Sequence, residues 1–178
     1  MDTRLQELLD HHEIKKLLNT YCHGCDRLDP ERMASVFHSD SWVDHAAEHC
    51  PGGEFVEETM AAQQAHTSMV SHLLGQSQID VTGEHAASET YFFCALRGSA
   101  QTGTKLLTFM GGRYIDTFAK DTGQWKIKKR VCVRDWSYSQ VVEQDFLAAV
   151  PFIDGTWSGD DPSYAALGLK HSRAPRVS

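Results

Sequence analysis

Residues 105–137 read KLLTFMGGRYIDTFAKDTGQWKIKKRVCVRDWS. Two segments of this stretch, 105–119 and 125–137, are rich in the β-branched and aromatic residues that favour strands. Between them, Lys120-Asp121-Thr122-Gly123 is typical of a hairpin connection. The stretch therefore predicts two long antiparallel strands.

The same pattern extends toward the N-terminus. Segments 69–81 and 86–98 are also strand-like, and the turn-forming stretch 80–84 joins them. A shorter strand is expected at 41–45. Four long strands after a group of helices indicate an α+β fold with an antiparallel meander. We expect a cone-shaped α+β barrel whose strongly curved antiparallel sheet wraps around the N-terminal helices and encloses one interior pocket.

Three helices are predicted before the long strands. In the first, 3–25, one face carries the apolar residues Ile14, Leu17, Leu18, Tyr21, Cys22 and Cys25. Gly24 helps to end this helix, and Asp26 lies at the edge of the same face. Asp29 and Pro30 predict the start of a second helix over 30–37. Gly52-Gly53 is expected to form a turn before a third helix over 54–67.

The domain organisation follows from these elements. Residues 1–141 are predicted to form one barrel domain. From Val142 the chain has a short helical pattern, and from Asp154 a tail rich in Gly, Ser and Pro. We expect residues 142–178 to form a C-terminal helix and tail, and the tail from Asp154 onward to be either disordered or packed on a neighbouring subunit.

Composition restricts the possible partners. The chain has 178 residues, 41% of them hydrophobic, as expected for one domain with a sizeable core. Its 24 acidic against 17 basic residues give a net charge of −7, which disfavours nucleic acid and anionic membrane surfaces as partners. No apolar stretch approaches the roughly 20 residues that cross a bilayer. The start, Met1-Asp2-Thr3-Arg4, lacks the layout of a secretory signal, so a cytoplasmic protein is expected.

Cysteine and histidine usage favours neither redox nor metal chemistry. Five cysteines without framework-like spacing are typical of reduced thiols. Cys22-x-x-Cys25 has redox spacing but closes a helix, whereas thioredoxin-type motifs open one. The ten histidines form no His-x-His or Glu-x-x-His signature, and His49 is expected in a loop. We predict no metal and no cofactor.

Asp26 and His72 are the main candidates for catalysis. If the fold brings them together, the imidazole can act as a general base oriented by a carboxylate. Such a pair needs no cofactor. A histidine base makes the rate depend on pH, so a flat rate profile between pH 5 and 8 would argue for another base. The alternatives are a histidine that only packs in the core and a carboxylate that only ends a helix.

Arg130 is the third catalytic candidate. Strict alternation would put it on a face with several other charged residues, so we expect a bulge or an end-of-strand transition to turn Arg130 or Trp136 inward. An inward arginine would stabilise negative charge on a leaving group. A structural ion pair with Asp116, Glu89 or Asp135 is the alternative.

Candidate substrate contacts are mostly aromatic. Tyr21 lies on the apolar face of its helix, and its side chain points away from that of Asp26. Its hydroxyl group can form a hydrogen bond with either a substrate or a buried carbonyl. His45 is a candidate second polar group in the same cavity. The remaining candidates, which could equally be core residues, are Tyr91, Phe109, Tyr114 and Trp136. A pocket lined by aromatics suits a flat apolar or aromatic substrate.

The chain resembles the SnoaL-like branch of the nuclear transport factor 2-like superfamily over residues 5–138. The stretches that carry the resemblance are Tyr21-x4-Asp26, Ser71-His72-Leu73-Leu74-Gly75, Ser88-Glu89-Thr90-Tyr91, Gly111-Gly112-Arg113-Tyr114-Ile115-Asp116, Trp125-Lys126-Ile127-Lys128-Lys129-Arg130 and Asp135-Trp136. Enzymes of this family include scytalone dehydratase, bile acid 7α-dehydratase and hexachlorocyclohexane dehydrochlorinase, and some relatives resemble lyases of lignin-derived diaryl compounds.

The resemblance implies an activity and an assembly. Asp26 and His72 match the family's catalytic pair, and Arg130 matches an arginine that lines the dehydrochlorinase cavity. We therefore expect a cofactor-independent lyase that eliminates water, a halide or a small carbonyl fragment. An isomerase or cyclase with the same base, and a non-catalytic binding module, are the alternatives. The resemblance also implies a homo-oligomer, a trimer or a dimer, joined through the outer face of the sheet.

Overall fold

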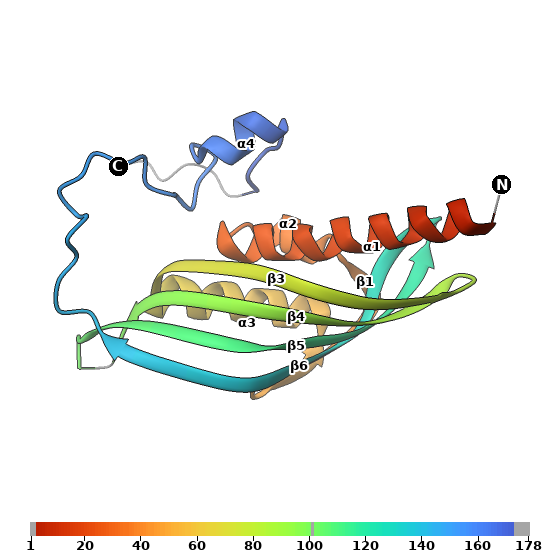
Figure 1. Ribbon diagram of the computed structural model, residues 1–178, viewed down its shortest axis with the longest axis horizontal. Helices are drawn as coiled ribbons and strands as arrows, with labels where there is room; N and C mark the ends of the chain where they lie inside the picture. The colour runs from red at the N-terminus through yellow and green to blue at the C-terminus, as the bar shows by residue number, and fades with distance from the viewer. Residues whose placement is uncertain (1–2, 101, 173–178) are drawn as a thin grey trace.

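The computed structural model describes residues 3–100 and 102–172 (Figure 1). Its helices are α1 (Thr3–Asp26), α2 (Pro30–Ala34), α3 (Gly52–His66) and α4 (Pro162–Leu167). Its strands are β1 (Phe37–His45), β2 (Glu48–Pro51), β3 (Thr67–Thr82), β4 (His85–Ser99), β5 (Lys105–Asp121) and β6 (Gln124–Val141). The predicted α+β class and the four long strands are confirmed.

The six strands form one curved, unclosed sheet in the order β2-β1-β6-β5-β4-β3. The pairs β3–β4, β4–β5 and β5–β6 are antiparallel, as predicted, whereas β1 pairs with β6 in parallel. The sheet is therefore mixed, and its edge strands are β2 and β3. Both α1 and α3 contact β3, and α1 runs along the sheet in Figure 1.

The predicted apolar stripe of α1 forms part of the hydrophobic core. Ile14, Leu18, Tyr21, Cys22 and Cys25 are all buried. They pack with buried side chains of the sheet and of α3 in a single cluster. This burial, rather than helix propensity, is the main source of stability for an amphipathic helix.

The region around α2 departs from the prediction. Asp29 caps α2, with its Oδ1 accepting from the backbone amide of Arg32 at 3.2 Å, and Pro30 occupies the first turn. The helix ends at Ala34, however, because Val36 and Phe37 join the sheet: the carbonyl of Val36 accepts from the backbone amide of Ile127. The prediction of helix up to Phe37 was wrong, since pairing with β6 overrides local propensity there.

The short strand β2 was not predicted. It pairs with β1 through Trp42–Pro51 and His45–Glu48. The expected loop position of His49 was therefore wrong, because this residue lies in β2 opposite Asp44. The expected turn at Gly52-Gly53 is instead the first turn of α3.

Bulges decide which residues of β6 face the core. Trp125 and Ile127 are buried, and a register shift at Lys128 lets Arg130 join them on the inner face. The predicted bulge is thus confirmed. A second shift at Asp135 places Trp136 opposite Gly111, and Trp136 is 50% exposed.

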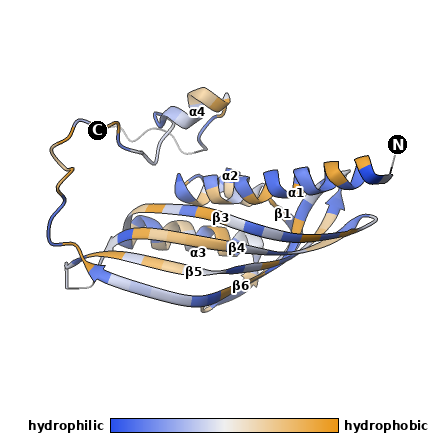
Figure 2. Cartoon of the chain, in the orientation of Figure 1, coloured by the Kyte–Doolittle hydropathy of each residue, from blue (hydrophilic) through white to orange (hydrophobic). Residues whose placement is uncertain are grey.

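The segment after β6 has no helix where one was predicted. Residues 142–161 form an irregular segment, which carries exposed apolar residues such as Phe146 and Ile153. Figure 2 colours parts of this segment as hydrophobic. It leads to α4, whose Tyr164 is buried and donates to Asp29 of the same chain. No helix within the described residues is long and apolar enough to cross a membrane.

Candidate functional site

The structure brings Asp26 and His72 into direct contact. Asp26 is the last residue of α1, and His72 lies on the edge strand β3. The Nδ1 atom of His72 lies 2.5 Å from Oδ1 of Asp26, and the backbone amide of His72 donates to Oδ2 at 2.9 Å. One carboxylate therefore orients both the ring and the main chain of the histidine.

The location of His72 on a sheet edge explains this geometry. The outer side of β3 has no neighbouring strand, so its backbone groups need other partners. The carboxylate of Asp26 supplies an acceptor for one of these amides. The side chains are 7% exposed for His72 and 14% for Asp26, so solvent competes little for either group.

A pocket of about 370 Å³ adjoins the pair between α1 and β3. It is lined by Asn19, Cys22, His23, Asp26, Arg27, His72, Leu73 and Leu74. Asn19 and Leu73 are exposed, so this pocket opens at the surface, in contrast to the closed interior pocket expected. It lies against both members of the pair.

Arg130 occupies the interior of the cone and is fully buried. Its Nε and Nη2 donate to the two carboxylate oxygens of Asp116, each at 2.8 Å. The rings of Tyr21 and Tyr114 stack on the guanidinium, each with its centroid 4.1 Å from Cζ. Of the three open ion-pair alternatives, the partner of Arg130 is Asp116, whereas Glu89 and Asp135 pair with Arg113.

One nitrogen of this buried cation has no partner. Among the described residues, no hydrogen-bond acceptor reaches Nη1 of Arg130. Burial alone would lower the pKa of Arg130, but the carboxylate of Asp116 outweighs burial and raises it above its usual value. Arg130 therefore stays charged, with Asp116 as its counter-charge, and keeps one unused N–H inside the cone; such unsatisfied buried donors are costly.

His45 lies near the same interior. Its side chain is 29% exposed, and its ring is 5.3 Å from that of Phe55. Burial lowers the pKa of His45; Glu48 opposes this effect, while the charges of Arg130 and His72 add to it.

None of the six predicted substrate contacts is among the residues that line the pocket beside the Asp26–His72 pair, and neither is Arg130. Three of the six lie on the other face of the sheet. The structure does not bring Tyr91, Phe109 or Trp136 to the Asp26–His72 pair. His72 pairs with Cys94, so alternation along β4 directs Tyr91 to the opposite, outer face. On that face Phe93 lies 5.7 Å from Phe109 and 6.0 Å from Trp136 between ring centroids. Sequence reasoning assigned them to the pocket because aromatic character does not reveal the face of a strand.

A thiol also lies next to the pair. The ligand atoms of Cys25, Asp26 and His72 lie within 4.8 Å of one another, and in the part of the chain that the structure describes these three residues form the group that could hold a metal ion. The 2.5 Å contact leaves no space for an ion between Nδ1 and Oδ1. Burial raises the pKa of Cys25 to about 12, although Gln63 donates a hydrogen bond to its sulfur. Both Cys22 and Cys25 are free and buried.

Several site residues were missed from the sequence. Asn19, His23 and Arg27 line the pocket. Asn19 and His23 lie on α1 and Arg27 follows its last residue, so their spacing of four places them on one face with Asp26 nearby. That spacing could have identified them. Trp157 donates from Nε1 to the carbonyl oxygen of Asp26 at 3.1 Å, and no local pattern signals this contact across 131 residues.

Comparison with known proteins identifies the fold. Residues 6–131 match the SnoaL-like domain. A type 2 hexachlorocyclohexane dehydrochlorinase (LinA) superposes with a TM-score of 0.71 at 16% identity, covering 85% of this chain and 100% of that chain. The LinA-type3 enzyme from Novosphingobium barchaimii LL02 gives 0.66 at 16% identity, with 85% and 99% coverage.

A third structure, from Novosphingobium aromaticivorans DSM 12444, is provisionally named scytalone dehydratase. It gives a TM-score of 0.66 at 22% identity and covers 74% of this chain and 88% of that chain. No curated protein sequence matches the chain. At these identities the likeness extends to the fold alone.

Proposed function

This chain belongs to the SnoaL-like domain family of the nuclear transport factor 2-like superfamily, and we propose that it is a cofactor-independent lyase. The substrate class proposed is a small apolar or aromatic molecule. The observation that carries this proposal is the direct contact of His72 with the carboxylate of Asp26 beside a pocket. Similar folds occur in a dehydrochlorinase, which makes an elimination plausible.

The geometry suits a histidine acting as a general base. With its proton on Nδ1 and directed at Asp26, the neutral ring has a free lone pair on Nε2. In the proposed step, Nε2 takes a proton from a substrate carbon or hydroxyl group. The electron pair of the broken bond forms the new double bond, and the leaving group departs with its own bonding pair. The carboxylate of Asp26 stabilises the imidazolium that forms.

In this proposal Arg130 acts on the departing group from the interior of the cone, since it is buried and is not among the residues that line the pocket beside Asp26 and His72. Its unpartnered Nη1 is a preorganised donor for an oxygen or halide that gains negative charge. Asp116, Tyr21 and Tyr114 hold the guanidinium in place. His45 supplies a second polar group from β1, kept neutral by the lowered pKa described above.

The proposal is tested by a substrate screen with matched variants. Aromatic and alicyclic alcohols, halides and diaryl compounds are incubated with the protein, and products are identified by mass. His72→Gln and Asp26→Asn should each lower turnover by roughly 10²-fold or more, as the loss of a positioned base implies. The exposed residues His66 and Asp80 provide controls, and His66→Gln and Asp80→Asn should retain activity.

Each outcome separates one alternative. Full activity of His72→Gln contradicts the proposed base. A product of unchanged mass but altered connectivity identifies an isomerase or cyclase with the same base. Binding without any product, at every compound tested, contradicts a lyase and supports a small-molecule binding module.

The cellular compartment and the oligomeric state are proposed from two separate observations. Five free cysteines support a reducing, cytoplasmic environment. The outer face of the sheet carries exposed Leu73, Tyr91, Phe93, Trp136 and Tyr138, an apolar patch that supports a homo-oligomer. A trimer is the first choice and a dimer the second.

A further inference from the structure

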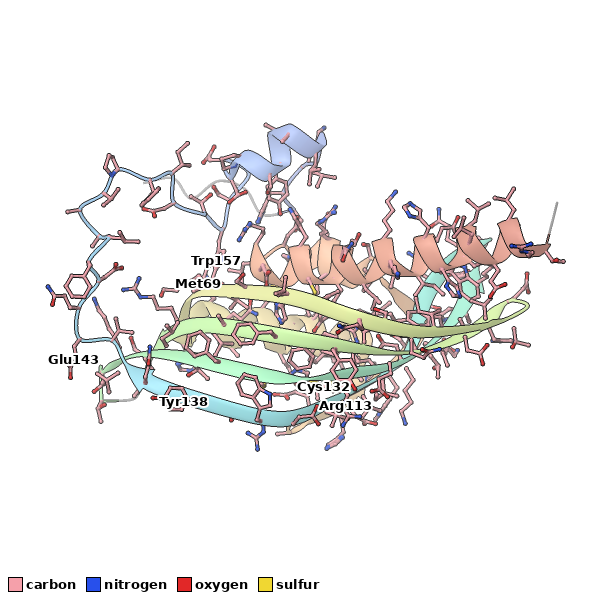
Figure 3. All side chains as sticks on the ribbon, in the orientation of Figure 1. Met69, Arg113, Cys132, Tyr138, Glu143 and Trp157 are labelled. Atoms are coloured by element: carbon pink, nitrogen blue, oxygen red, sulfur yellow. The ribbon has the colours of Figure 1, made fainter. Side chains whose placement is uncertain are left out.

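We infer that Trp157 is a positioning residue for the Asp26–His72 pair, and that residues 156–172 clamp the end of α1. This inference rests on the proposed function, since it concerns the same pair. Trp157 extends from the C-terminal segment toward the carboxyl end of α1 (Figure 3). It is partly buried against the hydrophobic core.

Only the last carbonyl group of α1, that of Asp26, depends on side chains for its hydrogen bonds among the described residues; the three carbonyls before it accept from the backbone amides of residues 27–29. The last carbonyl groups of a helix have no partners within it. Here the carbonyl of Asp26 accepts from Trp157 Nε1 at 3.1 Å and from Arg27 Nη1 at 3.2 Å. The carbonyl of Arg27 accepts from His171 at 2.9 Å. Leu28 then adopts a φ of +52°, so the chain leaves the helix axis at once.

The C-terminal segment is itself firmly attached at this corner. Tyr164 donates to Oδ2 of Asp29 at 2.8 Å, and Ser172 donates to Oδ1 at 2.5 Å. Arg27 forms an ion pair with Asp161 at 3.4 Å. Tyr164 and Asp29 are almost fully buried, so solvent does not compete for their hydrogen bond. The segment is therefore an integral part of the α1–α2 corner.

The clamp bears on the proposed chemistry because Asp26 has few other restraints. Within the described part of the chain, both carboxylate oxygens accept only from His72. The position of the carboxylate therefore follows the backbone of the last helical turn. Fraying of this turn would lengthen the contacts to the imidazole and to the backbone amide of His72.

Hydrogen exchange of the His72 backbone amide measures this positioning without a substrate. Trp157→Phe keeps an aromatic ring but removes the N–H donor. Trp42→Phe is the matched control, because Trp42 donates to Asp44 at the same 3.1 Å on β1, away from the pair. We expect Trp157→Phe to accelerate exchange at His72 by roughly two- to tenfold, as loss of one net hydrogen bond implies. Trp42→Phe should leave it unchanged.

Exchange at a second amide distinguishes local positioning from a change in the stability of the whole fold. The amide of Ile115, in the middle of β5, reports global unfolding and should not change in Trp157→Phe. Equal acceleration of exchange at His72 and Ile115 would mean that Trp157 stabilises the whole fold and does not specifically position the pair, which would overturn the inference.

Asp26→Ala separates this inference from the proposed function. It removes the acceptor and should accelerate exchange at His72. If Asp26→Ala does so and Trp157→Phe does not, the clamp is refuted and the catalytic pair stands. If Asp26→Ala has no effect either, the pair itself is refuted.

Discussion

Single residues in this protein serve two elements at once. Asp26 ends α1 and binds two donors of His72 on β3. Arg130 binds Asp116 and stacks on two tyrosine rings, yet keeps one N–H unused. Removing one partner of such a buried pair leaves an uncompensated charge, which costs more than the pair contributes.

At the scale of single residues, His45 on β1 predicts that the stability of the fold depends on pH. Burial lowers the pKa of His45 in the folded protein. The unfolded chain therefore binds a proton more readily, and stability present above about pH 6.5 is lost as pH falls through the folded value. His45→Gln should flatten the decline in urea midpoint between pH 7 and 5. The exposed His12→Gln control should decline as the wild type does, and an unchanged slope in His45→Gln would contradict the prediction.

The residues predicted from sequence differ in how they were found. Asp26 and His72 were identified from helix periodicity and from the family resemblance, and the structure brings them together. The face of the sheet on which Trp136 lies could not be predicted from the sequence, because a bulge at Asp135 reverses the alternation of β6. Trp157 lies 131 residues from its acceptor, beyond the reach of any local pattern.

At the scale of elements, α1 and α2 approach each other closely at Gly24. A Cβ atom at Gly24 would lie 2.5 Å from the backbone nitrogen of Met33. Gly24→Ala should therefore force the helices apart and cost about 1–3 kcal/mol. Gly53→Ala in α3 meets nothing within 4 Å and should stabilise by about 0.5–1 kcal/mol through helix propensity. Chemical denaturation of both variants measures the change in the free energy of unfolding, which should be negative for Gly24→Ala and positive for Gly53→Ala. Two changes of the same sign would contradict this packing.

A second junction joins the first half of α1 to the β5–β6 hairpin. Asp10 accepts from the indole of Trp125 at 2.8 Å and pairs with Lys120 at 2.8 Å. Burial alone would raise the pKa of Asp10, but hydrogen bonds from Lys120, Trp125 and Gln6 outweigh it and lower the pKa.

Asp10→Asn should therefore be less stable than the wild type by about 1–3 kcal/mol at pH 7. Because a lowered carboxyl pKa contributes stability only above its unfolded value, the difference should shrink below about pH 4. Urea unfolding across this range measures it. A difference independent of pH would contradict the assigned charge on Asp10.

Sequence patterns predicted elements well where burial is periodic. The stripe of α1 and the four long strands were found in this way. The short strand β2 was missed because four residues carry too little periodicity, and its formation depends on pairing with β1. The helix expected after Val142 does not form there, and the only C-terminal helix among the described residues is α4.

At the scale of the whole molecule, the outer face of the sheet predicts self-association. Tyr138 and Trp136 are 59% and 50% exposed on β6, and Tyr138 is labelled there in Figure 3. Light scattering should give the mass of a trimer or a dimer. The double variant Trp136→Lys, Tyr138→Lys should sediment as a monomer, since charges in an apolar interface are strongly unfavourable. A wild-type protein that stays monomeric at high concentration would contradict the proposal.

The bond between Tyr164 and Asp29 spans 135 residues of chain. A ribosome adding about 5–20 residues per second needs roughly 7–27 s to travel that distance. During this interval the first helical corner has already emerged while its C-terminal partner is still unmade. The carboxyl end of α1 therefore acquires its last hydrogen bonds only after Trp157 and Tyr164 have been synthesised.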